Sequence, residues 1–429
     1  MCYNKPILQK IFCLLQQTNP KKEVIVFMKY LVILGDGMAD TPVPELGGQT
    51  PLMAAKTEHL DRLAKSSTLG MVKTVPEHFA PGSDVANLSV MGYAPERYYT
   101  GRSPLEAISM GLSLANEDVT LRCNTVTLSE EEPFEAKTMI DYSADEITTA
   151  ESARLIEAVQ KALGDELFTF YSGISYRHCL VWKSGHTESL LTPPHDITLR
   201  PIASYLPKGK DGEKLLSLMK KSYEILKDHP VNQARVARGL KPANSIWLWG
   251  SGKKTVLPAF SEMTGKTGCV ISAVDLVKGI GLAAGMEVPN VPGVTGNVHT
   301  DFDAKRNAAL EALEKGADFV YLHMEAPDEA GHRHEVDNKV LSIEKIDRQV
   351  IGPICQALET QNIPFRMLVL PDHPTPLAIR THSSDPVPFL FYDSTHPVCG
   401  KDRYHEISAT ETGLFYPSGP ALMERFLSE

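Results

Sequence analysis

The fold is decided by a stretch near the start of the chain that reads Tyr30-Leu31-Val32-Ile33-Leu34-Gly35-Asp36-Gly37-Met38. There an apolar run with β-branched residues ends on glycine and aspartate. The same form returns at 319–324, which is followed by Asp328, and at 367–370, which is followed by Asp372. Short runs of this kind are typical of buried parallel strands. The sequence therefore predicts an α/β fold built on a parallel sheet.

Candidate metal ligands follow these three predicted strands. In open α/β sheets, ligands bind beyond the carboxyl ends of the strands. A pair such as Asp328 and His332, four residues apart, shares one face of a helical turn. Each side chain alone is compatible with a helix cap or an ordinary polar group. Together they indicate a site for two divalent metal ions, with the candidate ligands Asp36, Asp328, His332, Asp372, His373 and His382.

A candidate nucleophile for such a site is Ser83, in the stretch Ala80-Pro81-Gly82-Ser83-Asp84-Val85-Ala86-Asn87-Leu88. Two metals about 4 Å apart clamp the attacking and leaving oxygens of a phosphoryl transfer. Ser83 opens a predicted helix, where free N–H groups favour a phosphate, and a metal would lower the pKa of its hydroxyl. The alternative is that Ser83 only caps the helix.

In the order of these motifs, from Asp36 and Gly82-Ser83-Asp84 to Thr381-His382-Ser383, the chain resembles the alkaline phosphatase superfamily. Residues 83–93, followed by 99–107, are similar to the archaeal-type cofactor-independent phosphoglycerate mutases, and the likeness runs from Met28 to the C-terminus. One departure is Ser103, in Gly101-Arg102-Ser103-Pro104, where family members read Gly-Arg-Gly-Pro. It lies outside the metal ligands and weakens only the substrate assignment.

The resemblance implies a reaction and the residues that perform it. The phosphoryl group would move between O3 and O2 of glycerate through a phosphoserine on Ser83. Two Mn²⁺ or Mg²⁺ ions would assist, and no 2,3-bisphosphoglycerate would be needed. It also implies two sets of metal ligands: Asp36, Ser83, Asp372 and His373 for one ion, and Asp328, His332 and His382 for the other.

The order of the motifs predicts a discontinuous metal domain over 28–115 and 235–429, with an inserted substrate-binding α+β domain over 116–234. Within the insert, alternating polarity predicts strands at 119–128, 168–174, 178–182 and 196–200, and a helix over 144–163. Parallel strands are expected to resume at 245–249 and 268–272. The chain is expected to cross between the domains near 112–118 and 228–243, where Gly111 and Gly239 make a hinge plausible.

Basic residues of the insert are candidates for holding the substrate carboxylate. Arginine suits this role because its planar guanidinium binds a carboxylate or phosphate with two hydrogen bonds. For each residue the alternative is a solvated surface charge. The candidates are Arg122, Arg177, His178 and Arg235, with Lys266 expected to neutralise the phosphoryl group.

Size and composition agree with a soluble, cytoplasmic enzyme, and the resemblance implies that its substrate is a small phosphorylated molecule. The 429 residues are 42% apolar, and the net charge of −10 with no long basic run argues against a nucleic-acid partner. Seven scattered cysteines without C-x-x-C indicate reduced thiols, and no apolar run is long enough for a membrane span. Residues 1–27 are expected to be an extension that contributes little to the fold, since their apolar run is too short for a signal peptide. The oligomeric state is left open.

Two other functions remain open at this point. A phosphomonoesterase, or a phosphotransferase acting on homoserine, would use the same metal site and the same nucleophile. A catalytically inactive binding protein on this scaffold is the third possibility, and the complete ligand set and intact Ser83 argue against it.

Overall fold

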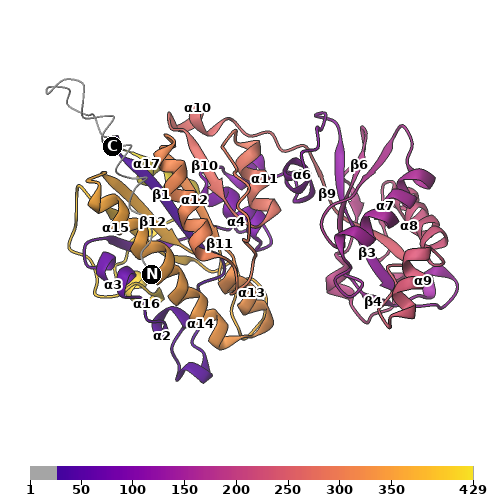
Figure 1. The fold of residues 1–429 in the computed structure, drawn as a ribbon, viewed down its shortest axis with the longest axis horizontal. Helices are drawn as coiled ribbons and strands as arrows, with labels where there is room; N and C mark the ends of the chain where they lie inside the picture. The colour runs from indigo at the N-terminus through magenta and orange to yellow at the C-terminus, as the bar shows by residue number, and fades with distance from the viewer. Residues whose placement is uncertain (1–26, 429) are drawn as a thin grey trace, which may run out of the picture.

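The computed structural model describes residues 27–428, so the predicted N-terminal extension lies outside the described residues except for Phe27. Two parts lie side by side along the longest axis of the molecule (Figure 1). The larger part is built on a seven-stranded sheet and the smaller on a separate antiparallel sheet. Among the described residues, no helix combines the length and the apolar character that crossing a membrane requires.

The large sheet confirms the predicted parallel core. Its strand order is β10-β11-β1-β12-β13-β2-β14, and β1 pairs in parallel with both β11 and β12. Among its described strands, β13 alone runs antiparallel. The bounds are β1 Lys29–Gly35, β2 Thr68–Val72, β10 Gly268–Ile271, β11 Phe319–Met324, β12 Phe365–Leu370, β13 Val387–Asp393 and β14 Phe415–Tyr416.

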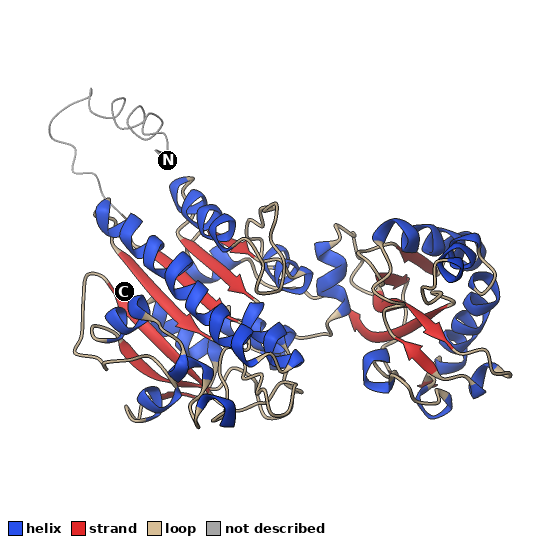
Figure 2. Ribbon diagram, turned by 60° about the horizontal axis from the view of Figure 1, so that its bottom comes forward, coloured by secondary structure: helices blue, strands red, loops and turns tan. Residues whose placement is uncertain are grey.

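Helices cover both faces of this sheet (Figure 2), which is why its central strands are apolar at successive positions. Leu31 and Ile33 of β1 pack into the apolar layer on one face of the sheet, here called layer one. Val32 and Leu34 pack into the apolar layer on the other face, here called layer two. Layer one includes α3 Glu58–Ala64, α12 Phe302–Glu314, α14 Val336–Lys345, the π-helical η5 Ile346–Ile351 and α15 Gly352–Thr360. Layer two includes α4 Ser83–Val90, α6 Ser103–Ser109, α10 Phe260–Thr264, α11 Asp275–Ala283 and α17 Gly419–Leu427. Four further helices are α2 Pro51–Ala54, α5 Pro95–Tyr98, α13 Ala326–Arg333 and α16 Glu406–Thr410.

The second sheet has the order β4-β3-β6-β5, with β9 on the other side of β3. All its pairings are antiparallel, and α7 and α8 pack with it in one apolar core. The bounds are β3 Val119–Leu128, β4 Met139–Asp141, β5 Phe168–Tyr171, β6 Arg177–Trp182, β9 Ser245–Lys253, α7 Thr149–Leu163, α8 Gly212–Leu226 and α9 Pro230–Ala237. A two-stranded sheet pairs β7 Ser189–Leu190 with β8 Lys208–Gly209.

The structure corrects the predicted strand at 245–249. It was expected in the parallel sheet, but as β9 it pairs antiparallel with β3 of the second sheet. Its apolar side chains, among them Trp247, belong to the core of the second sheet. The chain therefore returns to the large sheet after Lys253, not at 228–243. Gly239, which was expected near this crossing, instead lies between α9 and β9, within the part built on the second sheet.

Two further predicted elements of this region are also corrected. Residues 196–200 form no strand, because a 3-10 helix at Pro194–Ile197 is followed by a turn in which Leu199 has a positive φ. The predicted helix over 144–163 begins only at Thr149, with the Thr148 side chain as its cap. It cannot begin earlier because Ala144, Asp145 and Glu146 all have positive φ angles, a conformation outside the right-handed helix.

Candidate active site

Asp36 lies at the carboxyl end of β1 and is buried, with 2% of its surface exposed. Its Oδ2 lies 3.0 Å from Nε2 of His323, a residue of the neighbouring β11. Its Oδ1 is buried without any hydrogen-bond partner. The next residue, Gly37, has φ +61°, and a Cβ there would lie 2.7 Å from the Asp328 Cα. The glycine thus lets the loop after β1 approach the segment after β11.

Asp372 and His373 follow the carboxyl end of β12, as Asp36 follows that of β1. Asp372 Oδ2 accepts a hydrogen bond from the Asn87 side chain at 2.8 Å, and Oδ1 accepts one from Gly37 N–H at 3.2 Å. His373 Nε2 lies 3.4 Å from Asp372 Oδ2 and 3.8 Å from Asp36 Oδ1. Ligand atoms of Asp36, Asp372 and His373 all lie within 4.8 Å of one another.

A second cluster surrounds Asp328 on α13. His332, four residues later on the same helix, has its Nε2 3.3 Å from Asp328 Oδ2. His382 Nε2 lies 3.4 Å from Asp328 Oδ1 and 2.9 Å from His332 Nε2. His373 stacks on His382 with ring centroids 3.9 Å apart. The two clusters therefore adjoin at His373, which the sequence analysis had assigned to one ion only.

Ser83 is the first residue of α4, and its Oγ lies 3.2 Å from His373 Nε2. The N-cap position is occupied by Gly82, and no side chain caps the helix. The alternative that Ser83 serves only as a helix cap is therefore wrong. Its hydroxyl instead points to the histidine at which the two clusters meet.

The charges of this site match the chemistry of divalent cations. Burial, together with Asp372 and Asp328, raises the pKa of Asp36 well above its ordinary value. Although burial opposes it, hydrogen bonds from His332 and His382 lower the pKa of Asp328. Bound cations would neutralise the crowded carboxylates and give the buried Oδ1 of Asp36 a partner. They would also accept the facing Nε2 atoms of His332 and His382 as ligands. Oxygen and nitrogen donors without thiolate suit hard to borderline ions.

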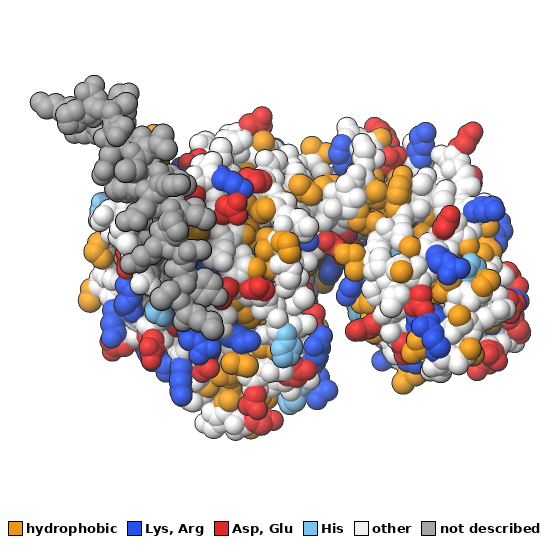
Figure 3. All heavy atoms as spheres, in the orientation of Figure 1, with side chains coloured by type: hydrophobic (Ala, Val, Ile, Leu, Met, Phe, Trp, Pro, Cys, Tyr) orange, Lys and Arg blue, Asp and Glu red, His pale blue; other side chains and the backbone are white. Residues whose placement is uncertain are grey.

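A cavity of about 550 Å³ lies between the two parts of the molecule, and its lining includes residues that neighbour Asp328 in the sequence. The space-filling view shows a cleft between these parts (Figure 3). From the second sheet and α6 the cavity is lined by Arg102, Glu106, Arg122, Arg177 and His178, among others. From the large part Glu325 and Glu329, close to Asp328 on the chain, contribute to its wall.

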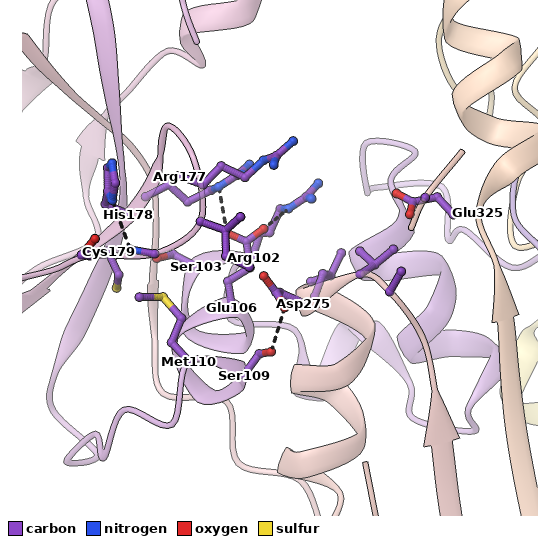
Figure 4. A pocket seen from close by; sticks show the side chains of 18 of the residues that line it. Arg102, Ser103, Glu106, Ser109, Met110, Arg177, His178, Cys179, Asp275 and Glu325 are labelled. Atoms are coloured by element: carbon purple, nitrogen blue, oxygen red, sulfur yellow. Dashed lines mark hydrogen bonds and ion pairs between the residues drawn. The ribbon is translucent and has the colours of Figure 1, made fainter. Parts of the chain in front are cut away.

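The arginines of this cavity are organised by Glu106. Its carboxylate lies 2.8 Å from Nε of Arg102 and 2.9 Å from Nε of Arg122. Arg122 also lies over the Trp249 ring at 4.2 Å, and Arg177 over the Tyr176 ring at 4.5 Å. In Figure 4 the side chains of Arg102 and Arg177 point the same way, toward the side of the cavity where Glu325 lies. The positive groups therefore face the metal-ligand side.

Two predicted substrate residues lie elsewhere. Arg235 is buried, and its guanidinium is fully engaged by Glu151 at 2.7 Å and by the carbonyls of Ala144 and Lys241. Lys266 lies before β10 and over the ring of Tyr30, at the amino ends of the parallel strands. The candidate ligands lie at the opposite ends, about 20 Å away for a six-residue strand. Neither residue lines the cavity, so the structure does not bring either of them together with the other substrate candidates.

Three residues were not assigned from the sequence. Arg102 and Glu106 stand four apart in the motif at 99–107, a spacing that places them on one helical face. His323 stands within the apolar run of β11, where an imidazole is unexpected, and burial lowers its pKa to about 3. Its neutral ring bonds Asp36 on one side and the Ser272 hydroxyl at 3.2 Å on the other. Such a contact orients the carboxylate that is a candidate ligand.

Comparison with known sequences is consistent with this geometry. A family model described as 2,3-bisphosphoglycerate-independent phosphoglycerate mutase matches residues 64–232. A relative from Geobacter sulfurreducens, named as a probable 2,3-bisphosphoglycerate-independent phosphoglycerate mutase, is 50% identical over 401 residues, which cover 93% of this chain and 100% of the relative. A relative of the same enzyme name from Methanothrix thermoacetophila is 49% identical, with 94% and 100% covered.

Solved structures agree on the fold. A protein of Pyrococcus horikoshii superposes with a TM-score of 0.78 at 29% identity, covering 94% of this chain and 99% of that one. A cofactor-independent phosphoglycerate mutase from Thermoplasma acidophilum has a TM-score of 0.61 at 24% identity with the same coverage, and supports the fold alone. Because relatives about 50% identical are covered over their whole length, the chain belongs to the family of 2,3-bisphosphoglycerate-independent phosphoglycerate mutases.

Proposed function

We propose that this protein interconverts 3-phosphoglycerate and 2-phosphoglycerate by way of a phosphoserine on Ser83, without 2,3-bisphosphoglycerate. The observation that carries the proposal is the position of the Ser83 hydroxyl, 3.2 Å from His373 at the junction of the two clusters. The family membership of the chain supports the reaction, and this contact supports the route.

The two clusters are the proposed sites of two divalent metal ions, Mn²⁺ or Mg²⁺. One would be held by Asp36, Ser83, Asp372 and His373, and the other by Asp328, His332 and His382. When bound, such ions stabilise the charge of the transferring phosphoryl group and lower the pKa of a serine hydroxyl. The protein's own contribution is to hold the oxygen and nitrogen donors in place before any ion arrives.

Ser83 has to receive the phosphoryl group from one substrate oxygen and return it to the other. Its place at the first position of α4 favours this, because the free N–H groups of a helix N-terminus stabilise a phosphate. Asn87, one turn later on the same helix, donates to Asp372 and also to the Ser83 carbonyl. These bonds tie the nucleophile's helix to the loop that carries Asp372 and His373.

The glycerate has to remain bound while it turns. The part of the chain that forms the second sheet is the proposed substrate-binding insert, and Arg122 and Arg177, with Arg102, would hold the substrate carboxylate. A cavity of about 550 Å³ leaves room for a three-carbon acid to reorient. Burial of the glycerate between the two parts would keep water from the phosphoserine, which would otherwise be hydrolysed.

A cytoplasmic location is part of the same proposal. Within residues 27–428 the five cysteines, at 123, 179, 269, 355 and 399, are free, which supports a reducing compartment.

The proposal is tested by an enolase-coupled assay on 3-phosphoglycerate in the absence of 2,3-bisphosphoglycerate. The expected result is metal-dependent formation of 2-phosphoglycerate. The same preparation is assayed for release of inorganic phosphate and for phosphorylation of homoserine. Product in either of these, with no 2-phosphoglycerate, would contradict the proposal and favour the phosphomonoesterase or the homoserine phosphotransferase.

A further inference from the structure

Lys339 of α14 is buried in the large part of the molecule, and it is paired with an equally buried Asp40. The side chains of both residues have 0% of their surface exposed, and Lys339 Nζ lies 2.7 Å from Asp40 Oδ2. Taking two charges out of water is costly, and apolar residues of similar size are often as stable. A pair of this kind therefore calls for an explanation other than stability alone.

The ammonium of Lys339 connects loops that follow different strands. It donates to the Thr375 carbonyl at 2.7 Å and lies 3.4 Å from the Ala39 carbonyl. Ala39 and Asp40 follow Asp36 in the loop after β1, and Thr375 follows His373 in the loop after β12. Lys339 itself belongs to α14, which follows the helix of Asp328 and His332.

Each connection reaches a candidate metal ligand within a few residues. The Thr375 hydroxyl donates to Asp328 Oδ1 and lies 3.4 Å from His373 Nδ1. Asp40 Oδ2 also accepts a hydrogen bond from the Leu377 N–H at 3.1 Å, which joins the loops after β1 and β12 a second time. The ammonium group thus contacts the loops after β1 and β12 directly, and Thr375 extends the connection to Asp328 of α13.

We infer that Lys339 and Asp40 are positioning residues, which hold the loops after β1 and β12, and through Thr375 the Asp328 carboxylate, at the spacing that two divalent ions require. Neither residue is among the candidate ligands or lines the cavity. The inference rests on the proposed function for the identity of the two metal sites. Loss of the pair is expected to let the loops move apart and so to weaken metal binding, in the way that partners behind a ligand commonly affect affinity by about 10- to 100-fold.

The test is a calorimetric titration of the purified, metal-stripped protein with Mn²⁺. Lys339→Met is expected to weaken binding about tenfold or more, and Asp40→Asn, which exchanges a single atom, is expected to weaken it in the same direction. Because both act through one contact, the double variant should bind no more weakly than Lys339→Met. Asp40→Asn carries the test if Lys339→Met fails to fold.

The matched control is Arg366→Met. Arg366 forms a buried pair with Asp393, 2.7 Å apart, near the start of β12, the end of the strand away from Asp372. This variant is expected to lose stability while keeping its Mn²⁺ affinity. Equal affinities in wild type, Lys339→Met and Asp40→Asn, with lowered melting temperatures, would make the pair a plain core contact and overturn the inference. The titration requires no substrate, so an unmodified protein that binds Mn²⁺ but isomerises nothing would contradict the proposed function and leave this inference standing.

Discussion

The hydroxyl of Ser83 lies 3.2 Å from Nε2 of His373, although the two residues are 290 positions apart in the chain. Ser83 begins α4, and His373 lies near the start of the loop after β12 with no part of its side chain exposed. The same imidazole nitrogen lies 3.4 Å from Asp372 and 3.8 Å from Asp36. The proposed nucleophile therefore lies where all the candidate ligands of one ion converge.

Replacement of Ser83 by alanine is expected to abolish isomerisation and leave the fold intact. The site offers no second nucleophile at this position. The measurement is the enolase-coupled rate together with the thermal unfolding midpoint. Ser89→Ala, a buried serine of the same helix whose hydroxyl has no partner, is the control and should retain activity. If Ser83→Ala kept a rate within about tenfold of wild type, the phosphoserine route would have to be abandoned.

Arg177→Ala is expected to convert part of the turnover into hydrolysis. Without this arginine the glycerate is held less well and escapes before the phosphoryl group returns to it, which leaves the phosphoserine to water. The ratio of inorganic phosphate to 2-phosphoglycerate should rise. Arg200→Ala, an exposed arginine of the same part of the molecule, is the control and should leave the ratio unchanged. An unaltered ratio in Arg177→Ala with normal turnover would make Arg177 a surface residue.

Arg235→Ala is expected to act on stability and not on substrate binding. The change would leave the buried Ala144 carbonyl without its hydrogen-bond donor, whereas Glu151 would keep Arg238 as a partner. Leaving a buried acceptor without a partner costs about 1–3 kcal/mol. The measurement is urea unfolding alongside the KM for 3-phosphoglycerate. A raised KM in a variant of normal stability would restore Arg235 to the substrate site.

His178 is expected to make the protein less stable in mild acid. Burial lowers the pKa of His178 to about 3, whereas the unfolded chain has the ordinary value near 6.5. Between these values the unfolded state binds the extra proton, so stability falls as the pH falls below about 6.5. His178→Asn keeps an acceptor for the Gly173 N–H and removes the titration. The free energy of unfolding should therefore fall less steeply between about pH 6 and 4.5 in the variant than in wild type, and equal slopes would contradict this account.

The aspartates among the metal-ligand candidates could be predicted from the sequence because each one closely follows the end of an apolar strand. The carboxyl ends of parallel strands lie at the same edge of a sheet, whatever the order of the strands. Asp36, Asp328 and Asp372 therefore meet, although Asp328 lies 292 positions after Asp36 and Asp372 lies 44 positions after Asp328. Asp328 and His332 were predicted to share one face of a helical turn, and both lie in α13 at that spacing.

No comparable rule in the local sequence fixes the position of the strand at 245–249, of Lys266 or of Arg235. The apolar run at 245–249 is equally suited to a parallel strand or to an antiparallel one, and only its pairing with β3 decides between them. Lys266 precedes a strand of the correct sheet, but at its amino end. Arg235 and Arg177 look alike in sequence, and tertiary contacts bury one against Glu151 while the other lines the cavity.

The stereochemical course at phosphorus is the most direct test of transfer through Ser83. A 3-phosphoglycerate whose phosphoryl group is made chiral with oxygen isotopes is converted by the metal-loaded enzyme, and the configuration of the 2-phosphoglycerate is determined. Each in-line displacement inverts the configuration, so transfer to Ser83 and back predicts overall retention. Overall inversion would mean a single direct transfer between the substrate oxygens and would contradict the account.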